Sequence, residues 1–116
     1  MITIHTNRNI LYTIVSEKIT EEDFEKLKPA LKKLLGEFPK VRWYYEMEDF
    51  DGWEVKTFFE DTQFSLSHRN DFEKIAMVGE KKWQEWMTEI MKPFTSAEIK
   101  YFSTEERDDA RKWIEE

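Results

Sequence analysis

Residues 74–83 constrain the fold more than any other segment. They read Lys-Ile-Ala-Met-Val-Gly-Glu-Lys-Lys-Trp, so a short apolar run ends at Gly79 and a helical pattern begins at once. Such a run is typical of a strand that is buried on both faces of a parallel sheet, and the helix that follows covers one face. In open α/β sheets, ligands bind at the carboxyl ends of these strands. The segment therefore predicts an α/β fold with a binding edge near Gly79.

The rest of the chain alternates strand and helix patterns in the order β-β-α-β-α-β-α-β-α. The predicted strands cover residues 2–5, 10–15, 41–47, 74–78 and 97–102. The predicted helices cover residues 21–35, 53–66 and 80–91, with a last one after Ser103 or Thr104. Thr20 and Asp23 are expected to cap the first helix, and Gly36 to end it. Short connections favour right-handed crossovers, so we expect a mainly parallel five-stranded sheet with an antiparallel N-terminal edge strand and four helices.

Composition limits the functional classes. A single domain over residues 1–116 is expected for this length. The net charge is −7, with lysines interleaved among acidic residues, which argues against nucleic acid as a partner. The chain lacks cysteine, an N-terminal secretion signal and any apolar run near the ~20 residues of a membrane span. We therefore expect a cytoplasmic protein without a transmembrane segment.

Asp51, Gly52 and Trp53 follow the strand at 41–47 and are candidates for ligand binding. Free helix N–H groups, a permissive glycine and an aromatic ring would meet at that strand's carboxyl end. Ordinary turn chemistry explains the same residues more simply, because Asp51 would cap the next helix and Gly52 would permit the turn.

A second candidate group, Gly79, Lys82 and Trp83, follows the neighbouring strand and is expected to share one edge of the sheet with Gly52. Lys82 could orient a carboxylate or a lipid headgroup above an apolar floor at Trp83. The simpler interpretation is a solvated lysine and a core tryptophan at the start of a helix.

Aromatic residues make up 16% of the chain, and some are candidates for lining an apolar cleft between the second and third predicted helices. These are Phe58, Phe59 and Trp86, together with Trp53 and Trp83. A stripe of rings at helical spacing is usually core. However, Phe58 and Phe59 point in different directions on a helix, which leaves one ring for an apolar ligand or a dimer contact.

Nothing in the sequence indicates catalysis. His5 and His68 are the only histidines and have no metal-ligand spacing, so no metal or other cofactor is expected. The sequence also has no Gly-x-Ser-x-Gly elbow and no phosphate-binding Gly-Lys-Ser/Thr motif. We expect a protein that is not an enzyme.

Several motifs together resemble the SpoIIAA-like (STAS/SEC14-type) family of small bacterial domains. The matching residues are 19–24, 29–31, 50–53, 74–83, 97–102 and 110–113. The resemblance implies a β-α superhelix and either binding of a small apolar or lipid-like ligand or action as a regulatory module. The STAS branch is switched by phosphorylation of a serine after the middle strand, but residues 49–54 hold no Ser or Thr, so that switch is not expected here.

These observations predict a non-enzymatic binding domain. The first expectation is a small apolar or lipid-like ligand, with rings providing burial and lysines providing orientation. The alternative is a protein–protein interaction module, as a homodimer or with another partner, in which the same rings pack against a second chain.

Overall fold

The computed structural model describes residues 1–53, 70–80, 82–92 and 96–116. The elements in chain order are β1 (Ile2–Asn7), β2 (Ile10–Ile19), α1 (Glu21–Glu37), β3 (Val41–Trp53), β4 (Phe72–Gly79), α3 (Lys82–Met91), β5 (Glu98–Ser103), the 3-10 turn η2 (Thr104–Glu106) and α4 (Arg107–Glu115). The helix predicted at 53–66 falls outside the described residues, except that Trp53 belongs to β3. None of the described helices is both long and apolar enough to cross a bilayer.

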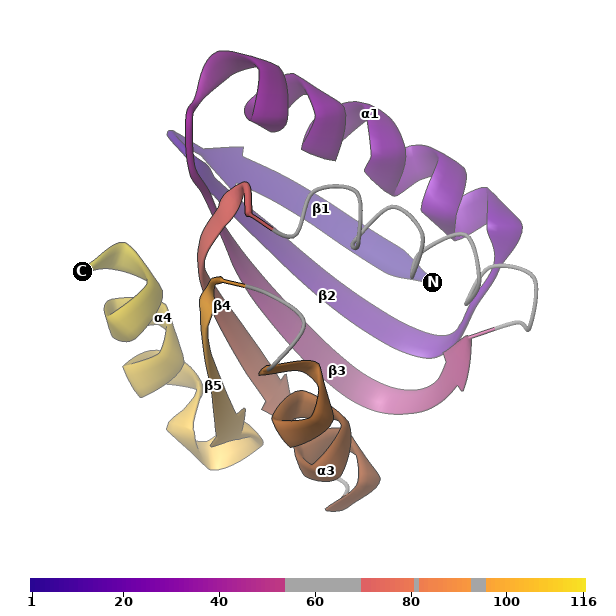
Figure 1. The fold of residues 1–116 in the computed structure, drawn as a ribbon. Coiled ribbons are helices and arrows are strands. Elements are labelled where there is room, and N and C mark those ends of the chain that lie inside the picture. Colours follow the sequence, from indigo (N-terminus) through magenta and orange to yellow (C-terminus); the bar gives the residue numbers. More distant parts are fainter. Residues whose placement is uncertain (54–69, 81, 93–95) are drawn as a thin grey trace.

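The five strands form one sheet in the order β1-β2-β3-β4-β5 (Figure 1). β1 pairs with β2 antiparallel, and each later neighbour pairs parallel. The predicted sheet, with its antiparallel N-terminal edge, is confirmed. Of the four predicted helices, three fall on described residues, as α1, α3 and α4.

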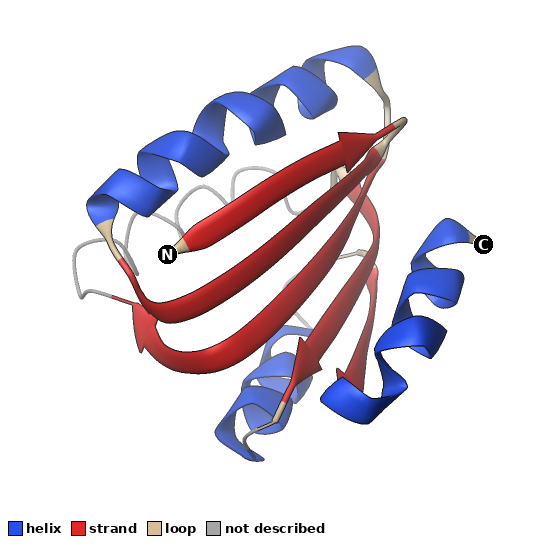
Figure 2. Ribbon diagram, turned by 180° about the vertical axis from the view of Figure 1, so that it is seen from behind, coloured by secondary structure: helices blue, strands red, loops and turns tan. Residues whose placement is uncertain are grey.

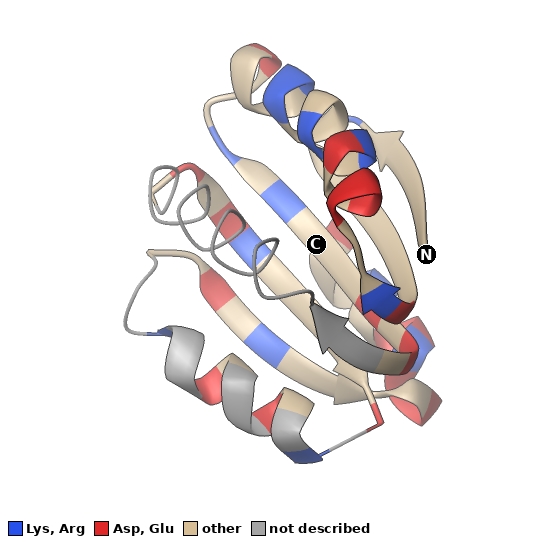
Figure 3. Ribbon diagram, turned by 90° about the vertical axis from the view of Figure 1, so that its right-hand side faces the viewer, with Lys and Arg blue, Asp and Glu red and all other residues tan. Residues whose placement is uncertain are grey.

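Helices cover both faces of the sheet. The first face, which α1 and α3 cover, carries Leu11, Val15 and Trp43, and the α1 residues Leu27 and Leu31 pack on it. The two helices lie on the same side of the sheet in Figures 1 and 3. Alternate residues point the other way because the side-chain period of a strand is two.

The second face is the side that α4 covers. Its buried cluster joins Tyr44, Val78 and Phe102 of the sheet to Ala110 and Ile114 of α4. α4 contacts β3, β4 and β5, and Figure 2 shows it beside the β4–β5 end of the sheet.

The capping interaction predicted for α1 is confirmed. Thr20 Oγ1 accepts the Asp23 backbone N–H at 3.2 Å, and the Asp23 carboxylate accepts the Thr20 N–H at 3.1 Å. The predicted end of the helix was wrong, because Gly36 lies inside α1, which continues to Glu37. The Phe38 N–H still donates to the Leu34 carbonyl at 3.0 Å, so the helical hydrogen bonding runs past the glycine.

Two cations hold the carboxyl end of α4 against the sheet. Arg42 Nη1 donates to the Ile114 carbonyl at 2.9 Å, and Lys74 Nζ donates to the Trp113 carbonyl at 3.2 Å. The last carbonyls of a helix have no partner within the helix and carry partial negative charge, which basic groups satisfy. α4 is therefore fixed by charge as well as by its apolar stripe.

Candidate functional site

The carboxyl half of β3 is the most irregular part of the sheet. Pairing with β2 is even up to Ser16 opposite Glu48, and then Glu17 faces Phe50 and Lys18 faces Gly52. β3 thus carries extra residues there, as at a β-bulge, and the end of β3 curls away from β4 in Figure 1.

Backbone strain accompanies this irregularity. Glu17 has a φ of 57° and Asp49 a φ of 44°, although neither is glycine. Residues other than glycine pay energy in this left-handed region, and such strain gathers at functional sites. The strain marks the same end of β3 that the sequence picked out for binding.

The structure corrects the local conformation predicted at Asp51, Gly52 and Trp53. They belong to β3, so the turn predicted at Gly52 and the role of Asp51 as a helix cap were wrong. Their residue types suit a turn, but β2 extends to Ile19 and supplies the hydrogen-bonding partners that keep this segment in the sheet. Their side chains lie outside what the structure describes.

Gly79 ends β4, where close packing favours a residue without a side chain. A Cβ atom at this position would lie 2.1 Å from Gln84 Oε1 and 3.2 Å from the Tyr101 hydroxyl. Gln84 is 2% exposed, and its Oε1 accepts the Glu80 N–H at 3.0 Å, so its side chain closes the turn between β4 and α3. The space above Gly79 is therefore occupied by protein.

The two predicted groups both lie toward the carboxyl ends of parallel strands, but at different levels along the sheet. Pairing between β3 and β4 ends at Glu46 and Val78, while Gly52 lies beside Lys18 of β2. Measured along β2, where Val15 faces Met47 and Lys18 faces Gly52, Gly52 is three residues, or about 10 Å, further along the sheet than the level of Gly79. Both strands end in the same direction, but on separate parts of the sheet.

The other predicted residues are placed only in part. Lys82 is exposed at the start of α3. Trp83 and Trp86 belong to α3, but their side chains are outside the described residues, as are Phe58 and Phe59 altogether.

Three rings pack in a row on the first face. The Trp43 ring centroid lies 5.6 Å from that of Tyr45 and 5.9 Å from that of Phe72. The Trp43 indole N–H donates to Thr13 Oγ1 at 3.0 Å, which satisfies the polar edge of the ring in an apolar setting. The row starts at Tyr45 and Trp43 of β3 and ends at Phe72, the first residue of β4. Phe72 pairs with Val41, so this end of the row lies at the amino ends of both strands.

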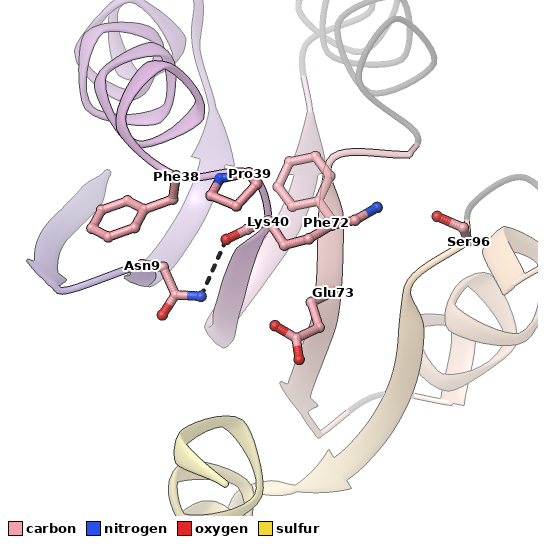
Figure 4. A pocket seen from close by; sticks show the side chains of 7 residues that line it. All are labelled: Asn9, Phe38, Pro39, Lys40, Phe72, Glu73 and Ser96. Carbon is pink, nitrogen blue, oxygen red and sulfur yellow. Dashed lines mark hydrogen bonds between the residues drawn. The ribbon is translucent and has the colours of Figure 1, made fainter.

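A hollow opens at this amino end of the strands, whereas the binding edge predicted from the sequence lies at their carboxyl ends. Its volume is about 620 Å³, within the range of small-molecule sites, although it is open to solvent. It is lined by Asn9, Phe38, Pro39, Lys40, Phe72, Glu73 and Ser96, which Figure 4 shows as sticks. Sequence reasoning missed this site, and the only local signal was the tripeptide at residues 38–40, where a ring, a proline and a cation follow each other.

The hollow combines apolar surface with charge. Phe38, Pro39 and Phe72 provide the apolar part, and the Lys40 ammonium donates to the Asn70 carbonyl at its edge. Asn9 Nδ2 donates to the Lys40 carbonyl at 3.1 Å, which fixes the connection between α1 and β3 (Figure 4).

A buried carboxylate lies on the second face. Glu46 is 1% exposed, accepts the Tyr44 hydroxyl at 2.5 Å, and has Arg107 Nε at 3.3 Å from the same oxygen. That Arg107 nitrogen has no hydrogen bond, so the attraction between the two side chains is ionic. Burial, and then the neighbouring Glu46, raise the pKa of the Tyr44 hydroxyl. Because the carboxylate is paired on both sides, its role is to fix α4 on β3.

Within the described part of the chain, no three His, Asp or Glu side chains are grouped so that they could hold a metal ion.

Comparison with known proteins agrees with this architecture. The SpoIIAA-like family profile matches residues 10–115. A crystal structure of an uncharacterized protein of the DUF3478 family with a SpoIIAA-like fold, from Shewanella loihica, superimposes with a TM-score of 0.81 at 28% identity, covering 98% of this chain and 92% of that one. A search of curated proteins found no match. The chain belongs to the SpoIIAA-like family.

Proposed function

We propose that this domain is a non-enzymatic binding module for a small apolar or lipid-like ligand with an anionic group. The hollow at the amino ends of β3 and β4 is the observation that carries the proposal. The partly exposed ring of Phe38 would contact an apolar tail above the largely buried Phe72, and the exposed Lys40 offers a cation to the head. Burial of apolar area provides affinity, while one cation fixes the orientation of the ligand.

The row of rings behind the hollow supports the same proposal. Phe72 stacks on Trp43, so a tail bound at Phe72 would rest on an aromatic layer that is already ordered. An ordered site loses less conformational freedom on binding than a flexible one does. Ligand binding here is recognition and needs no chemical step.

The residues predicted from sequence define a second location for the same ligand. They are Asp51, Gly52, Trp53, Phe58, Phe59, Gly79, Lys82, Trp83 and Trp86; of these, Gly52 and Gly79 lie near the carboxyl ends of β3 and β4. The strained backbone at Glu17 and Asp49 favours this end, whereas Gln84 fills the space at Gly79.

Titration with sodium oleate, followed by intrinsic tryptophan fluorescence, tests the proposal and separates the two ends. Lys40→Glu and Phe38→Ala are expected to weaken oleate binding about tenfold each, because a charge or a ring contact is worth about 1 to 2 kcal/mol. Lys82→Glu reports on the carboxyl end, and Lys32→Glu, on the exposed side of α1, is the matched control.

The outcomes are distinct. If Lys40→Glu weakens oleate binding and Lys82→Glu does not, the ligand binds in the hollow. If only Lys82→Glu weakens oleate binding, the ligand binds at the carboxyl ends of the strands. Failure of the wild-type protein to bind oleate, together with native mass spectra free of any co-purified lipid, would overturn the proposal.

The second candidate function is a protein–protein interaction module that binds no small ligand. The specific observation in its favour is the outer edge of β1, which has no neighbouring strand among the described strands. A mass above 14.2 kDa in size-exclusion chromatography with light scattering would show a homodimer, and capture of another chain would show a different partner.

A further inference from the structure

We propose that the outer edge of β1 binds an extended, acidic segment of a partner protein, which pairs with β1 as an additional strand of the sheet. The proposal gives the second candidate function a surface and a class of partner, and it rests on that function. It does not depend on the ligand hollow at Phe72.

β1 has the features of an edge that is open to pairing. Alternate residues of an edge strand turn their N–H and C=O groups outward, where another strand can use them. Natural sheets usually block such edges with charge or proline, and Ile2–Asn7 contains neither. By contrast, β5 at the other edge exposes Glu98 and Lys100.

A groove lies beside this edge, between β1 and α1. It has a volume of about 470 Å³, and its apolar lining includes Ile4, Ala30 and Leu34. Ile4 and Ala30 are only partly buried, so the groove offers apolar surface that is still accessible. A strand added at β1 would direct every second side chain into this groove, because side chains alternate between the faces of a sheet.

The charge of the groove selects the partner. Arg8 and Lys33 line it with two cations against the single carboxylate of Glu37. The chain as a whole carries a net charge of −7, so this is a basic site on an acidic protein. Lys and Arg lie along the middle of α1 in Figure 3. Acidic side chains flanking the apolar positions of the incoming strand complement this arrangement.

A second copy of this chain fits the edge less well. Because α1 contacts both β1 and β2, pairing two β1 strands about a two-fold axis would bring the two α1 helices to about 10 Å from each other. Lys33 is exposed and lies beside the middle of β1, close to such an axis, so the two copies would bring their Lys33 side chains toward each other, and like charges oppose this contact.

The test uses a synthetic peptide of alternating valine and threonine flanked by two glutamates at each end, with a version flanked by lysines as its counterpart. Both are titrated into ¹⁵N-labelled protein and followed by NMR. The acidic peptide is expected to shift the amide signals of β1 and of the α1 flank at Ala30. Lys33→Glu combined with Arg8→Glu should weaken its binding at least about tenfold.

Lys32→Glu is the matched control, because Lys32 is exposed on α1 and does not line the groove. Unchanged binding by this variant, and weaker binding of the lysine-flanked peptide, support the proposal. Signal shifts confined to another surface would overturn it while leaving an interaction function in place. Binding of neither peptide at millimolar concentration, or a dimer that Lys33→Glu strengthens, would also overturn it.

Discussion

Gly79 and Gln84 make the turn between β4 and α3 sensitive to a single methyl group. In Gly79→Ala the new Cβ would meet Gln84 Oε1 at 2.1 Å, so Gln84 must move and release the Glu80 N–H. We expect a loss of about 1 to 3 kcal/mol in the free energy of unfolding, measured in urea, because overpacking and a lost hydrogen bond both destabilise. Gly36→Ala is the control, since nothing lies within 4 Å of that Cβ inside α1, and it should stabilise by about 0.5 to 1 kcal/mol. Equal midpoints for the two variants would contradict this account.

The ion pair of Glu46 and Arg107 predicts a coupling that a double-mutant cycle can measure. Arg107→Met leaves a 1% exposed carboxylate with Tyr44 as its remaining partner, and because Arg107 itself is 40% exposed we expect a loss of about 1 to 2 kcal/mol. Adding Glu46→Gln to that variant should restore part of the loss, because the uncompensated charge is removed. Lys112→Met, on the exposed side of α4, controls for the loss of a cation. Purely additive effects would show that the two side chains do not interact.

Asp23 predicts how stability depends on pH. Burial acts to raise the pKa of its carboxyl, but hydrogen bonds from Thr20 and from the Met1 ammonium outweigh burial and hold the pKa below its usual value. Because the pKa is lower in the folded state, the ionised carboxylate stabilises the protein at pH values above the unfolded pKa of about 3.9. This stabilisation is lost as the pH falls below that value and through the folded pKa. The stability difference between wild type and Asp23→Asn should therefore be constant near neutral pH and shrink below about pH 4. A difference that grows on acidification would contradict this sign.

Interactions between residues close in the chain were predictable, and distant ones were not. Thr20 and Asp23 are three residues apart, so a capping pattern identifies them directly. Glu46 and Arg107 are far apart in the sequence, and only the docking of α4 on β3 brings them together. Phe38 and Phe72 likewise meet at the hollow only because their elements are neighbours in the sheet.

Among the elements, β3 departs most from expectation. Its amino half was predicted because Val, Trp and Tyr favour strands. Its carboxyl half was interpreted as a turn, because Asp49, Asp51 and Gly52 are turn residues. Pairing with the long β2 overrode these local preferences, and such non-local pairing cannot be read from residue types.

The bulge in β3 leads to a prediction about strain. Asp49 has a φ of 44°, a conformation that glycine adopts freely, aspartate tolerates and alanine does not. We expect Asp49→Ala to be about 1 kcal/mol less stable than Asp49→Gly in thermal or urea unfolding. The same comparison at Glu98, which is exposed in β5, should reverse the order, because glycine weakens a regular strand. If alanine is as stable as glycine at position 49, the left-handed conformation is not maintained there.

The architecture as a whole followed from the sequence. Alternating strand and helix patterns with short connections allow few topologies, and the strand directions and the antiparallel N-terminal edge agree with the prediction. The relative position of the two predicted binding groups could not be predicted from the sequence. Parallel strands do end in the same direction, but Gly52 lies about 10 Å past the level at which β4 stops, beside β2 rather than beside Gly79.

A crystal structure of the protein grown with decanoate shows whether the hollow binds an acyl chain. We expect density for the chain against Phe38 and Phe72, with the carboxylate within hydrogen-bonding distance of Lys40 Nζ. A hollow filled only by solvent, with decanoate absent from both ends of the strands, would contradict this expectation.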